Sequence, residues 1–130
     1  MIWANEFVEL DKSVHDRLSF DCGEVELNEF IQKRAVKHME AGISTTMVLP
    51  ASESLPNSRY PICAFYTITA SDIDRETLPT SLRSKFPLYP IPVLLIAQMA
   101  VHLECQKQGL VFLASEKGPT SGNLKGDHPG

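Results

Sequence analysis

The sequence lacks the short motifs and long apolar runs that mark several large classes of protein. It has no Gly-x-Ser-x-Gly, Walker or His-Glu-x-x-His motif, which excludes a nucleophile-elbow hydrolase, a P-loop nucleotide enzyme and a zincin metalloprotease. No uninterrupted apolar stretch is long enough to span a membrane. The formal net charge of -4 argues against broad electrostatic binding of nucleic acid, although a local basic patch is compatible with it.

Cysteine and histidine are also sparse. The three cysteines, Cys22, Cys63 and Cys105, are odd in number and far apart in the sequence. This pattern disfavours a disulfide framework or a CxxC zinc site and favours buried, reduced thiols. The four histidines show no paired spacing of metal ligands (His15, His38, His102 and His128). We therefore predict that the chain holds no metal.

What is present indicates an ordinary globular chain. A length of 130 residues with 43% hydrophobic and 22% charged residues is typical of one domain. Residues 1–10 include Asn5, Glu6 and Glu9 and lack a basic start followed by an apolar run, so no signal peptide is expected. The sequence predicts a cytoplasmic protein without a membrane segment.

The strongest local pattern predicts a helix over residues 24–41. Apolar side chains recur there at helical spacing. Asp21 and Glu24 have the spacing of a capping box at its start, and Gly42 suits a left-handed stop after it.

The remaining periodicity predicts strands joined by loops (strands over residues 2–10, 44–49, 60–73 and 93–101). The last strand is expected to be buried, and the last three are expected to pair as an antiparallel meander. The loop at residues 77–92 contains four prolines, which exclude a regular sheet there and leave room for one helical turn near residues 81–84 (Pro79, Pro87, Pro90 and Pro92).

Six ordered fragments carry a family resemblance (Phe20-Asp21-Cys22-Gly23, Leu27-Asn28-Glu29-Phe30, Ser44-Thr45-Thr46, Ala64-Phe65-Tyr66-Thr67, Tyr89-Pro90-Ile91-Pro92 and Met99-Ala100-Val101-His102). Together they resemble the N-terminal half of the GNAT family of N-acetyltransferases, nearest the acetyltransferase toxins of bacterial toxin–antitoxin systems. The resemblance covers about residues 1–110. Residues 111–130 are a short apolar stretch and a tail rich in Gly, Pro and Ser.

The resemblance implies an α/β (α+β) fold, a truncated GNAT-like fold whose mostly antiparallel sheet is backed by helices. It also implies acetyl-CoA-dependent acyl transfer to an amine, with aminoacyl-tRNA among the acceptors and an antitoxin as a partner. In the family, backbone groups of the strand that matches Met99, Ala100 and Val101 hold the pantetheine arm. A Gln/Arg-x-x-Gly-x-Gly/Ala loop, matched by Gln106 and Gly109, holds the pyrophosphate.

The match to this loop is incomplete. Val111 stands where the family has a small residue, and a β-branched side chain does not readily take a positive φ. After Leu110 the sequence predicts no helix that would supply amides or a dipole for a diphosphate. No residue matches the family's catalytic tyrosine, so the catalytic residues stay unassigned and a monomer is expected to be impaired or inactive. Alternatively, the turn at residues 106–109 only ends a strand.

Other side chains are candidates with a simpler structural interpretation. Tyr66 and Tyr89 are phenolic acid candidates that more simply pack, and His102 is a candidate general base that more simply ends a strand. A basic stretch on the predicted helix, whose region contacts nucleic acid in tRNA-directed relatives, is more simply a solvated face (Lys33, Arg34 and Lys37).

Two rival functions are compatible with the same sequence. A half-fold exposes the edge of its last strand, which favours a non-catalytic interaction module or a homodimer, with residues 111–114 adding a strand at that edge. The abrupt change of character after Leu110 also suits a frame-altered remnant without selected activity.

Overall fold

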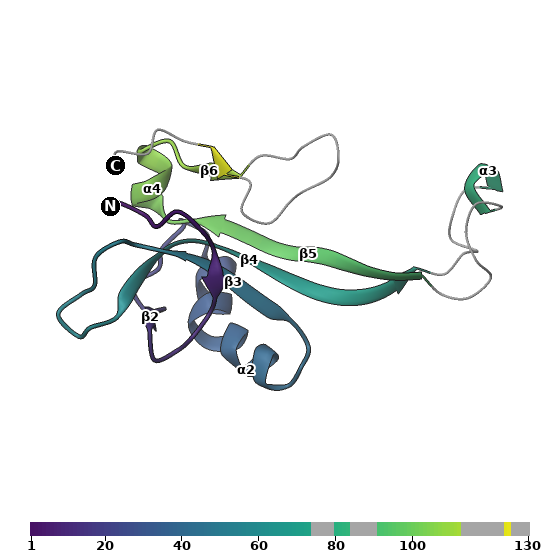
Figure 1. Ribbon diagram of the computed structural model, residues 1–130, viewed down its shortest axis with the longest axis horizontal. Coiled ribbons are helices and arrows are strands. Elements are labelled where there is room, and N and C mark those ends of the chain that lie inside the picture. The colour runs from purple at the N-terminus through teal and green to yellow at the C-terminus, as the bar shows by residue number, and fades with distance from the viewer. Residues whose placement is uncertain (74–79, 84–90, 113–123, 126–130) are drawn as a thin grey trace.

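The computed structural model describes residues 1–73, 80–83, 91–112 and 124–125. It is an α+β structure in which a mostly antiparallel sheet is backed on one face by a helix, as the sequence predicts (Figure 1). Within the described ranges, the helices are all too short or too polar to cross a bilayer.

The main sheet has five strands, in the order β1-β3-β4-β2, with β5 paired to β4 (β1 Val8–Glu9, β2 His15–Asp16, β3 Thr45–Pro50, β4 Tyr60–Ile73 and β5 Ile91–Val101). Strands β3, β4 and β5 form the predicted antiparallel meander. The pairing of β2 with β4 is parallel. The register of β4 and β5 shifts between Thr67 and Ile68, which places a bulge in the middle of this pair.

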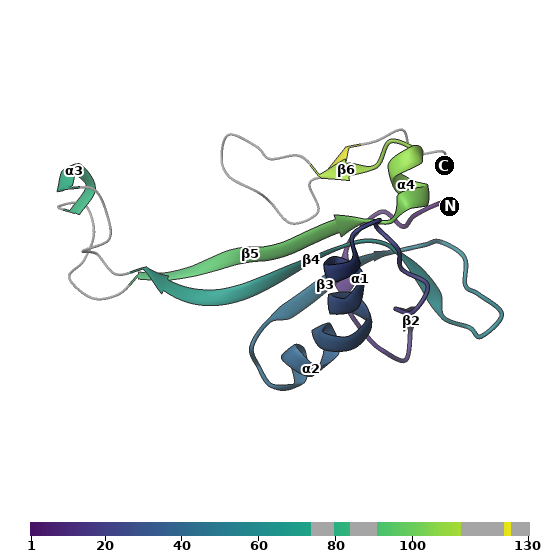
Figure 2. The same cartoon turned by 180° about the vertical axis from the view of Figure 1, so that it is seen from behind.

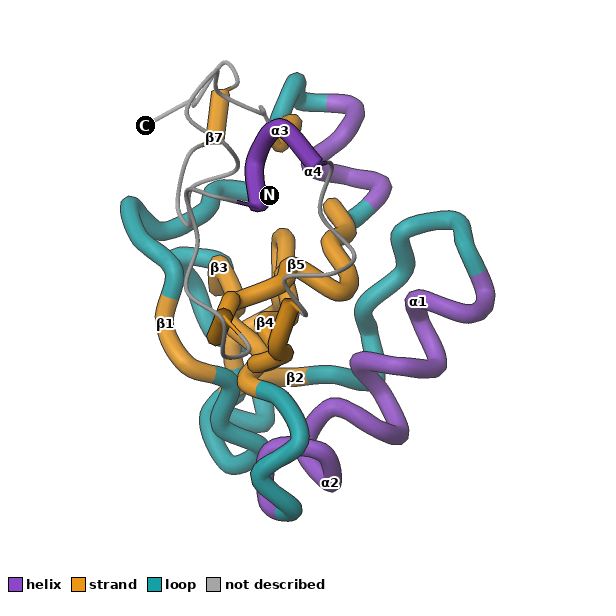
Figure 3. Tube along the Cα trace, turned by 90° about the vertical axis from the view of Figure 1, so that its right-hand side faces the viewer, coloured by secondary structure: helices purple, strands orange, loops and turns teal. Residues whose placement is uncertain are grey.

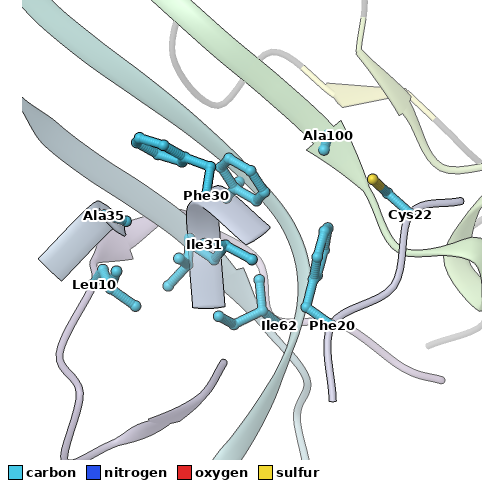
Figure 4. Packing of buried hydrophobic residues seen from close by; sticks show 10 residues of the cluster. Leu10, Phe20, Cys22, Phe30, Ile31, Ala35, Ile62 and Ala100 are labelled. Atoms are coloured by element: carbon cyan, nitrogen blue, oxygen red, sulfur yellow. The ribbon is translucent and has the colours of Figure 1, made fainter. Parts of the chain in front are cut away.

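One helix crosses the sheet in three consecutive segments, and its predicted range is confirmed (α1 Val25–Glu29, the π-helical turn η1 Phe30–Arg34 and α2 Ala35–Glu40). Figures 2 and 3 show this helix on one face of the sheet. It ends before Gly42, whose φ of 73° confirms the left-handed stop. Its buried side chains meet those of β3 and β4 in the first core, which Figure 4 shows in part (Leu10, Phe20, Phe30, Ile31, Ala35, Val48, Ile62, Phe65 and Ala100 among them).

The predicted capping box at the start of this helix is wrong. The N-cap is Glu24, which makes no side-chain cap hydrogen bond. Asp21 instead accepts hydrogen bonds at Oδ1 from the Gly23 N–H, at 2.9 Å, and from Asn28 Nδ2, at 3.0 Å. The aspartate therefore orders the turn before the helix, because a short carboxylate readily bonds the backbone two residues ahead.

A second core lies around the end of β5 and contains buried side chains from β3, β4, the N-terminal segment and a short helix (Trp3, Leu49, Ala51, Cys63, Ala64, Val101, Cys105 and Leu110). The short helix is α4, Leu103–Lys107, which the sequence analysis did not predict. His102 is its N-cap and accepts the Glu104 N–H at Nδ1, at 3.2 Å. The predicted turn at residues 106–109 therefore begins inside this helix and does not follow the strand directly.

Residues after α4 do not extend the edge of β5 as predicted. Strand β6, Val111–Phe112, pairs antiparallel with β7, Leu124–Lys125, in a separate two-stranded sheet. Residues 113 and 114, the rest of the predicted edge strand, lie outside the described ranges.

Beyond the last residue of β4 that pairs with β3, β4 and β5 continue as a two-stranded arm, in which Thr69–Ile73 pair with Ile91–Leu95. Figure 1 shows this arm projecting from the body, with the predicted helical turn, α3 Thr80–Arg83, beyond its end. Two predictions fail here. Pro92 lies within β5, which tolerates the missing N–H because it is an edge strand among the described residues. Leu94 is 74% exposed and Leu95 is 46% exposed, so this half of β5 is not buried.

The N-terminal segment pairs with two different strands of the sheet, β3 and β4. Val8 pairs with Val48 on β3, whereas His15 pairs with Tyr60 on β4, and Trp3 forms an isolated bridge to Ala51. The predicted strand over residues 2–10 is therefore broken into the Trp3 bridge and the two residues of β1.

Candidate functional site

A cavity of about 470 Å³ lies beside the C-terminal end of β5. Met99, Ala100, Val101 and Gln106, all predicted from the resemblance to line a cofactor site, are among its lining residues. Gly109, the fifth predicted residue, is not. The fold thus brings the end of β5 and the end of α4 to one cavity.

The backbone of β5 turns hydrogen-bonding groups toward this cavity. The His102 N–H donates to the Cys63 carbonyl at 2.8 Å, which sets the alternation of the antiparallel ladder between β4 and β5. In such a ladder every second residue directs its N–H and C=O away from the partner strand. Ala100 faces Phe65 and lies two residues before His102, so its backbone groups point toward β4 as those of His102 do. Met99 and Val101 alternate with these residues, so their backbone groups point away from β4. Their polar backbone groups therefore lie on the outer edge of β5.

Gln106 lines the cavity from α4. Its Nε2 donates to the Val101 carbonyl at 2.6 Å and to the Cys22 carbonyl at 3.2 Å. One side chain thus joins α4, β5 and the loop before α1. Of the outward groups at the end of β5, the Val101 carbonyl is satisfied in this way, which leaves the Val101 N–H and both backbone groups of Met99 facing outward.

The turn at residues 106–109 is the end of a helix. Gly109 has a φ of 91° and donates its N–H to the Gln106 carbonyl at 3.0 Å. The N–H groups of Gln108 and Leu110 both donate to the Cys105 carbonyl. These amides are already used, and the C-terminal end of a helix carries partial negative charge. The geometry suits the alternative in which the turn has a structural role. The pyrophosphate role of Gln106 and Gly109 stays a prediction.

The remaining walls come from residues that the sequence analysis did not predict to bind the cofactor. Cys22, Glu24 and Leu27 line the cavity from the start of the helix, and Leu110, Val111 and Phe112 line it from the segment after α4. Burial raises the pKa of the Cys22 thiol, so that group stays protonated at neutral pH. Cys22 and Leu27 lie within the fragments that carry the family resemblance, which is the one sequence signal that pointed to them.

Two catalytic candidates have structural roles. Tyr66 is buried and packs edge-to-face on Phe7, with ring centroids 4.9 Å apart, which confirms its packing interpretation. His102 uses Nδ1 to cap α4 and places Nε2 3.3 Å from the Ser19 carbonyl, so both ring nitrogens have partners within the chain. Tyr89 lies outside the described residues.

No family model matches the sequence. The fold is similar to several solved structures. A tyrosine-to-phenylalanine mutant of KacT has a TM-score of 0.68 at 22% identity, covering 84% of this chain and 62% of its own. AtaT complexed with acetyl-methionyl-tRNAfMet has a TM-score of 0.64 at 28% identity, covering 79% of this chain and 59% of its own.

AtaTR bound with acetyl-CoA has a TM-score of 0.62 at 28% identity, covering 83% of this chain and 60% of its own. The chain therefore spans about 60% of the length of the solved structures that it resembles. The sequence resemblance is confirmed at the level of the fold: the described part of this chain has the GNAT-type fold of the acetyltransferase toxins.

Proposed function

We propose that this chain binds acetyl-CoA in the cavity beside β5 and provides the N-terminal part of a GNAT-type N-acetyltransferase. The observation that carries the proposal is the outer edge of β5. There the outward Met99 N–H and C=O and the Val101 N–H lie beside a cavity whose walls include Leu27, Leu110 and Phe112. The neighbouring structure of AtaTR bound with acetyl-CoA gives independent support.

The residues at this edge fit the pantetheine arm. That arm carries amide groups, and an extended amide chain adds to a free strand edge by the same hydrogen bonds that join two strands. The Met99 N–H and C=O and the Val101 N–H offer alternating donors and an acceptor for it. When bound, acetyl-CoA supplies an acetyl thioester that an amine attacks. The apolar walls shield this group from water.

The turn after Gln106 fits the diphosphate poorly, because the N–H groups of Gln108, Gly109 and Leu110 all donate within the chain. We therefore expect the arm to provide most of the binding free energy, and we expect a monomer to bind acetyl-CoA with little turnover. The catalytic residues stay unassigned.

The acceptor and the partner follow from resemblance alone. We propose an amine acceptor of the aminoacyl-tRNA class, because AtaT is complexed with acetyl-methionyl-tRNAfMet. The exposed face of the helix carries Lys33, Arg34 and Lys37, which would meet RNA phosphates. An antitoxin is proposed on the same ground, since AtaT also has a structure bound to the C-terminus of its antitoxin.

Calorimetric titration of the purified chain tests the cofactor proposal. Acetyl-CoA and acetyl-pantetheine should bind with dissociation constants within about threefold of each other, because the diphosphate adds little. Met99→Pro removes the outward N–H without removing a bond between β4 and β5, so it should weaken both ligands about tenfold. Met99→Leu keeps the N–H and is the matched control. If neither ligand binds, the proposal is wrong; if only acetyl-CoA binds, the diphosphate is recognised after all.

One observation favours a second candidate, a homodimer formed through the arm of β4 and β5. Strand β5 has no charged residue, and the exposed side chains of Leu94 and Leu95 give the arm an apolar surface. An isolated two-stranded ribbon is marginally stable in water, so a covering partner would stabilise it. A second copy of the arm fits best if the two copies meet through β5, because β5 carries no charge and the net charge of -4 creates repulsion elsewhere. Asp72 is the charged residue among those of the arm that the structure describes, and it lies on β4.

Sedimentation velocity tests this dimer. Leu94→Lys should convert a dimer to a monomer, because it places two like charges in the interface. Leu18→Lys is the matched control, since Leu18 is 75% exposed and Leu94 74%, but Leu18 lies in the loop before α1, away from the arm. A wild-type chain that sediments as a monomer at high concentration would exclude the dimer and leave the cofactor proposal untouched.

A further inference from the structure

Cys63 on β4 and Cys105 on α4 meet inside the second core. Both side chains are fully buried in the same cluster, and their thiol groups lie close enough to interact. The Cys63 Sγ also lies 3.4 Å from Met1 Sδ, so the thiol pair has a thioether beside it. His102 fixes both backbones, because its N–H donates to the Cys63 carbonyl at 2.8 Å and its carbonyl accepts the Cys105 N–H at 2.9 Å. Two thiols that are distant in the sequence are thus held in contact by rigid elements.

The interaction between Cys63 and Cys105 distinguishes the two thiols. A hydrogen bond from Cys63 to the Cys105 thiolate lowers the pKa of Cys105, and it holds the pKa of Cys63 above its ordinary range. Cys105 is therefore the sulfur that ionises first and the better nucleophile of the pair. Cys22 lies apart from both, beside the cavity, where burial raises the pKa of its thiol.

We propose that Cys63 and Cys105 are a redox-modification site, which a hydroperoxide converts to an intramolecular disulfide between β4 and α4. The Cys105 thiolate attacks one oxygen of hydrogen peroxide, and the O–O bond breaks. This gives a sulfenic acid and hydroxide, which takes up a proton to become water. Cys63 then loses its proton and attacks the Cys105 sulfur, the S–S bond forms, and the sulfenic oxygen leaves as a second water. The two electrons lost by the sulfurs reduce the peroxide.

Access requires only local opening. Helix α4 has five residues, Leu103–Lys107, and the chain after it returns to a strand at Val111. A single helical turn of this kind is expected to open at a lower free energy than the central strands of a sheet. A peroxide molecule can then reach Cys105 while β4 holds Cys63 in place.

The bond would act on the cavity through the next residue. Gln106 follows Cys105, lines the cavity and donates hydrogen bonds to the Val101 and Cys22 carbonyls. Tying α4 to β4 would hold Gln106 in place at the cavity even when the helix would otherwise open. The inference itself does not depend on which ligand the cavity takes.

Peptide mapping of the oxidised full chain tests the proposal. The protein is treated with hydrogen peroxide, free thiols are alkylated, and disulfide-linked peptides are identified without reduction. The same reaction on the chain unfolded in urea is the control. In that state Cys63 has nearly the same sequence distance to Cys22 as to Cys105, so loop closure favours neither pair.

In the folded chain we expect the Cys63–Cys105 peptide in about tenfold excess over the Cys22–Cys63 peptide, because fixed contact raises the effective concentration of the pair. Cys22→Ser should give the same disulfide, and oxidation should raise its Tm by roughly 5 °C. A folded-state map that equals the unfolded one would overturn the proposal, as would a map in which Cys63 and Cys105 stay reduced. The two peptide maps, of the folded and of the unfolded wild-type chain, test the proposal even if the Cys22→Ser variant does not fold.

Discussion

The hydroxyl oxygens of Thr46 on β3 and Thr67 on β4 lie 2.7 Å apart, and both side chains are buried. Replacing one threonine by valine leaves the other hydroxyl without this partner in the core. Thr46→Val and Thr67→Val should each lower the free energy of unfolding by about 1–3 kcal/mol. The double variant should cost less than the sum of the two, because it removes both polar groups. Urea unfolding of the four proteins measures this, and additive losses would contradict the coupling.

The contacts of Gln106 predict a second effect. Gln106→Glu keeps the size of the side chain but replaces the donor that meets the carbonyls of Val101 and Cys22 by a carboxylate. We expect a loss of about 2 kcal/mol in the free energy of unfolding, because two carbonyls then face a negative charge. Lys107→Gln, at the exposed neighbouring position, should change it by less than about 0.5 kcal/mol. Equal effects of the two changes would show that the bonds of Gln106 contribute nothing.

Two glycines with positive φ should respond differently to alanine. Gly42, with a φ of 73°, has open space where a Cβ would lie, so Gly42→Ala should cost about 1 kcal/mol from the backbone alone. At Gly23, with a φ of 89°, the added Cβ would lie 3.3 Å from Leu103 Cδ2, so Gly23→Ala adds a steric cost. Thermal unfolding should therefore rank Gly23→Ala as the more destabilising change. The reverse order would mean that Leu103 moves aside freely.

His15 should make stability depend on pH. Burial lowers the pKa of this histidine, although the Asp11 carboxylate opposes the shift, and Nδ1 accepts the Asp11 N–H at 3.0 Å. Its pKa is thus lower in the folded than in the unfolded chain. The stability that follows is complete above the unfolded value of about 6.5 and is lost as the pH falls through the folded value. His15→Asn keeps an acceptor without a titrating ring, so its unfolding free energy should fall less than the wild type's between pH 7 and pH 5.

Much of this fold follows from local sequence. The observed bounds of β4, Tyr60–Ile73, equal the predicted ones because polar loop residues flank an apolar run, and Gly42 marks the end of the helix. The exposure of Leu94 does not follow in the same way. The apolar residues of β5 look alike along its whole length. Leu94 and Leu95 are exposed because they pair with the part of β4 that extends beyond β3 and the body of the fold, and the sequence of β5 does not show where that part begins.

The candidate site was also predicted only in part from the sequence. Met99, Ala100 and Val101 were predicted from the family resemblance to bind a cofactor; the structure shows that they line one cavity, and their cofactor-binding role stays a prediction. The contacts of Gln106 could not be predicted, because its partners are backbone carbonyls that any residue supplies and that only the tertiary fold brings close. Helix α4 was missed because a single turn of five residues is too short to show a helical period.

The N-terminal segment pairs with two strands, β3 and β4, that lie far from it in the sequence. This pairing constrains the order in which the chain folds. Val8 needs Val48, and His15 needs Tyr60, so these pairs close only after the intervening helix and hairpin have been synthesised. Contacts between residues this far apart raise the contact order and slow folding. During synthesis, the N-terminal segment therefore cannot become fixed on both strands until the chain has been made as far as Tyr60, and until then it has to stay free of other partners.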